Sequence, residues 1–300
     1  MPVTECRLRI GLGLIELIAA VAILGLLAGI IGSTIVGQQR FHRQAAAVLG
    51  ARQGVRDAME VLSTDIRGAS LEDTVRVMAD SALEFFAGIG ISVACRGLSG
   101  NSIALAAESP TANTLTSFLL NPDTGDIALI YRRDSIDHDA GRWERHRIAA
   151  VTPRSSDRDC LTQGAAAQEG FLLTLQSLIE RAVEPGTPVR FVRRGRYSLY
   201  RSSDRKWYLG YRRCNAIGAS ACGAIQPISG PYRPYSADKA RTGFLFEYYG
   251  SSGELLTSAA SPLAIARIDV SARAESDRTR EGSDGALPEF ASTSIAIRNR

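Results

Sequence analysis

An uncharged apolar segment of twenty residues, 17–36, constrains this chain more than any other feature of its sequence. At a rise of about 1.5 Å per residue, a helix of that length extends over about 30 Å, the thickness of a bilayer's hydrocarbon core. Glu16 is the only charged residue between residues 11 and 37, and a short basic leader with Arg7 and Arg9 precedes this block. The segment is therefore a candidate membrane span.

Three interpretations of the apolar block compete. A cleaved secretory signal has a shorter apolar region, of about 7–15 residues, and ends at small residues, whereas residues 37–40 form a poor cleavage site. A helix buried in a soluble core is seldom so long and so purely apolar. A single-pass anchor fits best. With Arg7 and Arg9 retained inside, the positive-inside rule places the C-terminal bulk of the chain outside the cytoplasm.

The residues around Glu16 narrow the interpretation. From Gly11 they read Gly-Leu-Gly-Leu-Ile-Glu-Leu, which resembles the class III signal of type IV prepilins, although Leu12 and Gly13 depart from its usual residues. The resemblance implies cleavage after Gly11 by a prepilin peptidase and N-methylation of the new terminus at Leu12. It also implies that Glu16 pairs with the terminal ammonium of a neighbouring subunit, because a carboxylate in an apolar bundle needs a cation.

Small residues line one side of the same helix. Ala22, Gly25, Gly29 and Gly32 recur at spacings of three and four, and Gly25 and Gly29 form a motif that lets helices approach closely in lipid. Glycine is common in membrane helices generally, so the motif alone is a weak indication of association. We treat Gly25, Gly29 and Gly32 as candidate assembly positions together with Glu16.

The apolar period changes after residue 40. Phe41, Val48, Val55 and Leu62 repeat every seven residues, which predicts an amphipathic helix with one buried face that ends near Gly68. Residues 52–70, in particular 59–67, and residues 294–299 resemble the PilW-type minor pilins and the J-type pseudopilins of type II secretion. The resemblance implies an α+β, ladle-like fold. The chain would then consist of a leader at 1–11, a transmembrane half-helix at 12–36, an amphipathic half-helix at 37–68 and an antiparallel, β-rich periplasmic head at 69–300.

Short alternating segments predict that the head is mainly β-structure. Hairpins are expected around the turns at 202–205 and 250–253, and residues 264–272 alternate as a half-buried strand does. Residues 171–179 fit a strand or a buried helix, and residues 273–287 read as an exposed loop. Other strands are expected at residues 102–107, 128–132, 189–193, 197–200, 206–212, 244–249, 254–256 and 294–298.

Four cysteines remain once the one in the leader is lost. In an exported domain, Cys95, Cys160, Cys214 and Cys222 predict up to two disulfides. Three pairings are possible. Cys214–Cys222 is favoured by its short loop, and Cys95–Cys160 then follows. A zinc site is disfavoured, because no Cys-x-x-Cys pair occurs and the three histidines are far from the cysteines in sequence.

Catalytic signatures are missing from the sequence. It contains no Gly-x-Ser-x-Gly elbow, phosphate-binding loop, His-Glu-x-x-His or dinucleotide fingerprint, so we expect neither an enzyme nor a cofactor. His138 lies in a polar stretch that lacks the spacing of a calcium loop and reads as a solvated turn. Asp123, Gly125 and Asp126 likewise read as turn formers.

A basic and aromatic stretch at residues 190–213 raises the question of DNA binding. Arginine supplies 33 of the 35 basic residues of the chain. A surface of arginine and aromatic side chains can hold phosphates and stack bases. Alternation along a strand sends many of these side chains to opposite faces, so we favour an arginine-rich hairpin whose rings pack inward. The arginines concerned are Arg190, Arg193, Arg194, Arg196, Arg201, Arg205, Arg212 and Arg213.

These observations favour a structural protein, a minor pilin or pseudopilin that helps to initiate or cap a type IV pilus or a type II secretion pseudopilus. Its expected partners are prepilin peptidase, other minor pilins or pseudopilins, the major pilin, the inner-membrane assembly platform and the lipid bilayer. The alternative is a signal-anchored periplasmic binding protein, DNA-capturing or not, that does not polymerise.

Overall fold

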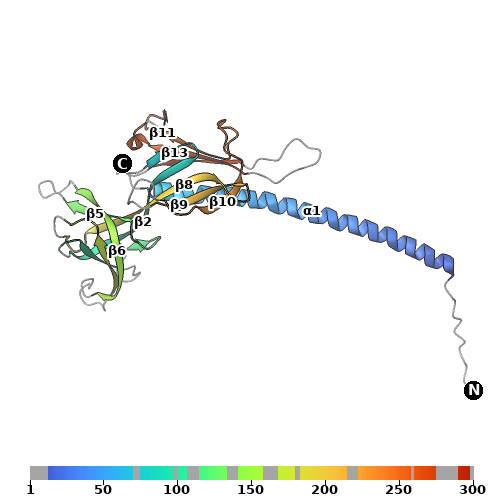
Figure 1. Ribbon diagram of the computed structural model, residues 1–300, viewed down its shortest axis with the longest axis horizontal. Helices are drawn as coiled ribbons and strands as arrows, with labels where there is room; N and C mark the ends of the chain where they lie inside the picture. The colour runs from blue at the N-terminus through green and yellow to red at the C-terminus, as the bar shows by residue number, and fades with distance from the viewer. Residues whose placement is uncertain are drawn as a thin grey trace, which may run out of the picture. The chain divides into compact units, whose positions relative to one another are not determined.

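The computed structural model describes residues 13–69, 75–97, 100–106, 115–133, 141–157, 168–179, 183–214, 222–257, 260–274 and 290–297. Within these residues one long helix, α1 (Leu14–Arg67), is followed by β-strands and a short 3-10 helix, η3 (Pro262–Ala264) (Figure 1). The strands are β1 (Val75–Met78), β2 (Ala82–Gly97), β3 (Ser102–Ala106), β4 (Ser117–Phe118), β5 (Ile127–Arg133), β6 (Gly141–Asp157), β7 (Gln168–Leu175), β8 (Pro188–Arg201), β9 (Trp207–Arg213), β10 (Gln226–Tyr232), β11 (Phe244–Tyr249), β12 (Leu255–Leu256), β13 (Arg267–Arg273) and β14 (Phe290–Ala296).

Six strands of the larger sheet pair into a closed ring, in the order β2-β3-β7-β6-β5-β8, and β8 pairs back onto β2. Every pairing in the ring is antiparallel. Closure of this kind pairs the edge hydrogen-bonding groups that an open sheet leaves free. Apolar side chains from all six strands form one buried cluster, which includes Ile103, Ile130, Ile148 and Phe191.

Strands β2 and β8 extend beyond the ring and pair from Ala82 with Ser198 to Val93 with Pro188. Beyond the ring, β9 and β10 continue the sheet from β8, and β1 pairs with β2. A separate four-stranded sheet has the order β12-β11-β13-β14. The head is therefore antiparallel throughout its described pairings and consistent with an α+β protein.

The C-terminal part of α1 joins the core that the two sheets share. Ala51, Val55, Ala58, Leu62 and Ile66 are each at most 6% exposed. Their spacing of three and four residues places them on one face of the helix. They pack in one cluster with side chains of both sheets. From residue 51 onward α1 belongs to the same compact unit as the strands, whereas residues 13–50 belong to another.

The predicted helix is confirmed, but its buried face is shorter than predicted. Val55 and Leu62 are buried, whereas Phe41 is 66% exposed and the buried positions begin at Ala51. A seven-residue repeat records which positions are apolar, but burial also needs a surface to pack against. Within the compact unit that holds the strands, α1 has such a surface from Ala51 on.

Most predicted strands are present, with shifts at their ends. The strand at 244–249 has the predicted bounds, and residues 189–193 and 197–200 belong to one continuous strand, β8. The undecided segment 171–179 lies largely in β7. The two longest strands, β2 and β6, were not predicted. Most of the loop expected at 273–287 lies outside the described residues.

Candidate functional site

Glu16 closes the first turn of α1. The backbone N–H of Gly13 donates a hydrogen bond to the Glu16 carboxylate, with N···Oε2 3.1 Å, and both residues are exposed. This is one half of a capping box, in which the third helical residue satisfies an N–H that the helix leaves unpaired. The carboxylate also lies at the positive end of the helix dipole. Glu16 thus has a local role within one chain and remains accessible to a cation from another.

The turns that follow expose an almost unbroken apolar surface. From Leu14 to Val36, every Leu, Ile and Val side chain is at least 47% exposed, and an 18-residue window of α1 has a mean hydropathy of 2.7. Ser33 and Thr34 donate their hydroxyl groups to the carbonyl oxygen of Ile30, at 2.8 and 2.9 Å, which suits surroundings without water. The helix is long enough and apolar enough to span a membrane.

The glycines of this segment leave open space beside it. A Cβ atom added at Gly25, Gly29 or Gly32 would have no neighbouring atom within 4 Å, so another helix has room to approach closely there. Gly11 and Leu12 lie outside the described residues. Cleavage after Gly11 and methylation of Leu12 therefore stay predictions.

The other end of α1 is tied to the larger sheet by polar contacts. The hydroxyl of Tyr197 in β8 donates a hydrogen bond to the Asp65 carboxylate. Burial raises the pKa of Asp65 above its ordinary value, against the smaller, opposing effect of this hydrogen bond. Burial, followed by the Asp65 charge, raises the pKa of Tyr197 as well, so the hydroxyl remains a donor. Tyr232 of β10 donates a second bond, of 3.1 Å, to the backbone carbonyl of Gly54.

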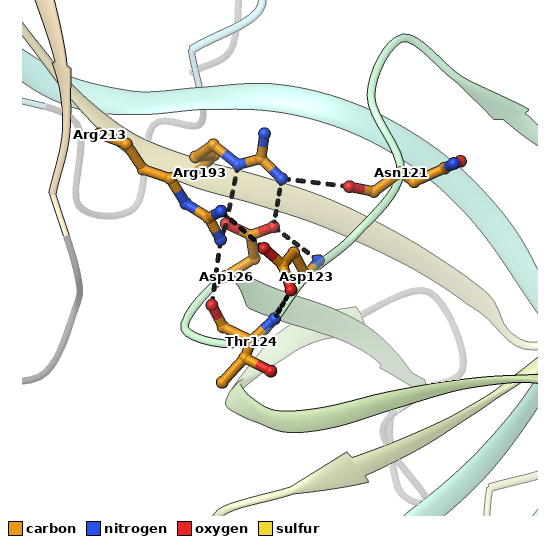
Figure 2. Close-up of polar contacts among 6 residues, drawn as sticks. All are labelled: Asn121, Asp123, Thr124, Asp126, Arg193 and Arg213. Atoms are coloured by element: carbon orange, nitrogen blue, oxygen red, sulfur yellow. Dashed lines mark hydrogen bonds and ion pairs between the residues drawn. The ribbon is translucent and has the colours of Figure 1, made fainter. Parts of the chain in front are cut away.

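Arg193 of β8 and Arg213 of β9 hold the turn that precedes β5 (Figure 2). The Asp126 side chain, 2% exposed, accepts hydrogen bonds from Arg193 Nε and Nη2, at 2.9 and 2.7 Å, and from Arg213 Nη2, at 3.1 Å. Arg213 also donates to Asp123 at 2.7 Å, and this bond contributes most to holding the pKa of Asp123 below its ordinary value. We call these four residues the arginine clasp.

The shape of the turn directs its two carboxylates toward the arginines of the clasp. Gly125 has a φ of 89°, in the left-handed region that glycine adopts without a steric penalty. The Asp123 N–H donates to Asp126 Oδ2 at 2.9 Å, and Arg193 Nη2 donates to the Asn121 carbonyl at 3.1 Å. The residues predicted only as turn formers therefore also neutralise two arginines, a role that no local sequence signal indicates.

Strand register divides the arginine-rich stretch between two faces. Arg193 and Arg213 lie on the face of the sheet that carries the clasp. Arg194, Arg196 and Arg212 occupy the alternate positions of β8 and β9 and lie on the opposite face. Arg194 is buried and donates to Glu84 of β2, with Nε···Oε1 2.6 Å. Residues 193, 194 and 196 therefore do not form one basic surface. This agrees with the prediction that strand alternation sends these side chains to opposite faces.

One of the two predicted disulfides is confirmed. A disulfide joins Cys214 and Cys222. Cys95 is also disulfide-bonded, but Cys160 lies outside the described residues, so that pairing stays a prediction. A Glu84 carboxylate oxygen lies within 4.8 Å of both sulfurs of Cys214–Cys222. Because the sulfurs are bonded to each other and Glu84 to Arg194, this group is not a metal site. His138 also lies outside the described residues.

A further polar group, at β6 and the end of β7, was not predicted. His146 Nδ1 lies 2.9 Å from Ser177 Oγ, and Nε2 lies 3.7 Å from Glu144 Oε2. Burial raises the pKa of Glu144, but the hydrogen bonds and charge of neighbours, chiefly Arg132, outweigh this and hold it below its ordinary value. Arg132 Nε binds the Glu144 carboxylate at 2.9 Å. The group lacks the close imidazole–carboxylate hydrogen bond of a catalytic triad and ties β7 to β6.

Comparisons with known proteins yield no match. No protein-family model matches the chain, and no curated protein or solved structure is significantly similar to it. Its function must therefore be inferred from its own residues and their geometry.

Proposed function

We propose that this chain is a structural subunit of a pilin-type filament, a minor pilin or pseudopilin held in the inner membrane by α1 before assembly. The observation that carries the proposal is the change of surroundings along one helix. Every large apolar side chain in the first 23 residues, from Leu14 to Val36, is exposed, whereas Ala51–Ile66 supply buried positions to the core of the head. Such a helix needs lipid, or other helices like itself, around its first half.

Assembly would give Glu16 a partner. A carboxylate at the centre of a membrane costs roughly 2.5–3.5 kcal/mol, and less near the interface. Cleavage after Gly11 would create an α-ammonium group at Leu12, four residues before Glu16 in sequence, and the ammonium group of a neighbouring chain would then pair with Glu16 in the same layer. The open space beside Gly25, Gly29 and Gly32 would let the two helices approach closely.

This proposal places the N-terminus in the cytoplasm and the head in the periplasm. Its partners are prepilin peptidase, the assembly platform and other pilin-type subunits, which include the major pilin. The helix and head suit a type IV pilus and a type II secretion pseudopilus equally. Initiating or capping the filament is the role that the resemblance to minor subunits favours.

The first test is the N-terminal mass of the membrane-extracted protein, produced with and without a prepilin peptidase. A methylated Leu12 start that depends on the peptidase would support the proposal. An intact Met1 start in both samples would refute it and leave an anchored periplasmic binding protein as the better interpretation.

A second test separates anchoring from assembly. Glu16→Leu should still enter the membrane but lose incorporation into sheared filaments, because the new terminus of its neighbour has no carboxylate to pair with. Glu60→Leu, which removes an exposed carboxylate from the other half of α1, is the matched control and should assemble normally. Normal incorporation of Glu16→Leu would contradict the proposed role.

A further inference from the structure

Seven arginines share the face of the larger sheet that lies opposite the clasp. Leu129 of β5 is paired with Arg145 of β6 on one side and with Arg190 of β8 on the other, and alternation along the strands assigns the remaining members. We call this surface the arginine face. Its arginines are Arg133, Arg145, Arg147, Arg190, Arg194, Arg196 and Arg212.

Few described acidic residues lie on the arginine face. Among the described residues paired across it in β2, β5, β6, β8 and β9, Glu84 is the only carboxylate, and it is bound to Arg194. Arg133, Arg190 and Arg196 form no ion pair with any described residue. Arg133 and Arg190 are exposed and Arg196 is half-buried. Within the part of the chain that the structure describes, no carboxylate therefore compensates the charges of these three arginines.

Aromatic rings lie among these arginines. The guanidinium carbon of Arg190 is 4.6 Å from the centre of the Trp143 ring, and that of Arg145 is 4.4 Å from the centre of the Phe86 ring. Tyr131 packs edge-on against Trp143, with ring centres 5.3 Å apart. Beneath them Phe86 and three aliphatic side chains form a small buried cluster. The arginine stems cover this cluster while their charged groups reach the surface.

We propose that the arginine face binds single-stranded nucleic acid. Guanidinium groups bind phosphate in a fixed, bidentate geometry, and a ring contact orients Arg190 before any ligand arrives. Half-buried Tyr131 and Trp143 offer rings on which unpaired bases stack, whereas a duplex keeps the faces of its bases within its own stack. Charge together with accessible rings favours a nucleic acid strand over an acidic polypeptide, which has the charge but no bases to stack.

The number of arginines sets the expected salt dependence. If Arg133, Arg190, Arg196 and Arg212 each neutralise one phosphate, log K falls against log salt with a slope of about −2.8 for a single strand. Affinity should then fall about 50-fold when salt rises from about 50 to about 200 mM. Stacking on Tyr131 contributes affinity that is independent of salt.

The test uses the full-length chain in an uncharged detergent and a fluorescently labelled oligothymidylate, with binding followed by anisotropy across a salt series. The triple variant Arg133→Gln, Arg190→Gln and Arg196→Gln should reduce the salt slope by about 2, because three phosphate contacts are lost. Tyr131→Leu should weaken binding without changing the slope. Thermal unfolding of each variant verifies that the head remains folded.

A matched control removes the same charge elsewhere. Arg56, Arg67 and Arg241 are exposed and lie off the arginine face, and changing all three to Gln should leave the slope and affinity within about twofold of the starting protein. Equal losses in the two triple variants would overturn the proposal, because bulk charge would then explain binding. Absence of binding at low salt would also overturn it, as would polyglutamate competing as well as unlabelled oligothymidylate. The proposal does not depend on filament assembly, so its failure would leave the proposed function intact.

Discussion

Replacing Asp126 with alanine should destabilise the head more than any other single change in the turn before β5. The Asp126 carboxylate, 2% exposed, accepts two hydrogen bonds from Arg193 and one from Arg213. It also accepts the backbone N–H of Asp123 at 2.9 Å. Asp126→Ala would leave the Arg193 side chain, which is only 12% exposed, without a carboxylate.

The expected loss of stability follows from the unequal exposure of the two arginines that bind Asp126. Removing one member of a buried ion pair costs about 3–5 kcal/mol, because the other charge stays buried and unpaired. Arg213 is 33% exposed and can turn toward water, so the lower end, about 3 kcal/mol, applies. Asp123→Ala is the matched control. Its carboxylate is 60% exposed, so its pair with Arg213 should contribute at most about 1 kcal/mol.

Thermal unfolding of the full chain in detergent measures the difference. For a unit of this size, 1 kcal/mol corresponds to about 2–4 °C in melting temperature. Asp126→Ala should therefore lower Tm by about 6–12 °C, and Asp123→Ala by no more than about 4 °C. Equal shifts for the two variants, or a shift below about 2 °C for Asp126→Ala, would refute the inference that burial sets the cost.

Other parts of the head allow further predictions. Tyr197→Phe removes the donor to buried Asp65 and should cost about 1–3 kcal/mol in urea unfolding at neutral pH. Burial raises the folded-state pKa of Asp65 above its unfolded-state value. The free energy of unfolding therefore falls as the pH rises from the unfolded-state pKa to the folded-state pKa. The variant raises this pKa further, so its deficit should shrink as Asp65 becomes protonated at low pH, and a deficit that is the same at every pH would contradict this role. Leu62→Ala, at a fully buried position of α1, should cost about 2–5 kcal/mol, seen as a lower urea midpoint, whereas an unchanged midpoint would contradict its place in the core. Replacing Cys214 and Cys222 together by serine opens a link with a sequence separation of 8, and loop entropy predicts a loss of about 2.5 kcal/mol in the same assay.

Strands were predicted correctly where neighbouring residues alone indicate them, and were missed where contacts with distant residues stabilise them. Strand β11 was predicted with its observed bounds, because its apolar and aromatic run ends at a clear glycine turn. Strand β6 was missed because its residues include Arg142, Glu144, Arg145 and Arg147, and such a charged run reads as a solvated segment. Its charges are accommodated because Glu144 binds Arg132 across the ladder and Arg145 lies over the Phe86 ring.

Strand β2 was missed for a different reason. Gly88 and Gly90 interrupt its apolar pattern, and glycine lowers the propensity for a strand. The structure shows why glycine is placed there. A Cβ at Gly88 would lie 2.8 Å from the carbonyl oxygen of Gly68, and one at Gly90 would lie 2.5 Å from the Phe118 ring. Close approach by other parts of the chain, which no local pattern records, requires these two glycines.

By itself, the sequence determined the apolar helix and the isolated carboxylate at Glu16 and favoured the pairing of Cys214 with Cys222, because length, hydropathy and short loops are properties of neighbouring residues. Only the tertiary structure decided which arginines are neutralised and which face outward. Arg193 meets Asp126 across 67 positions of sequence and Arg213 meets it across 87. Strand register, which is set by packing across the whole head, determines such contacts, and a shift of one residue would exchange the two faces.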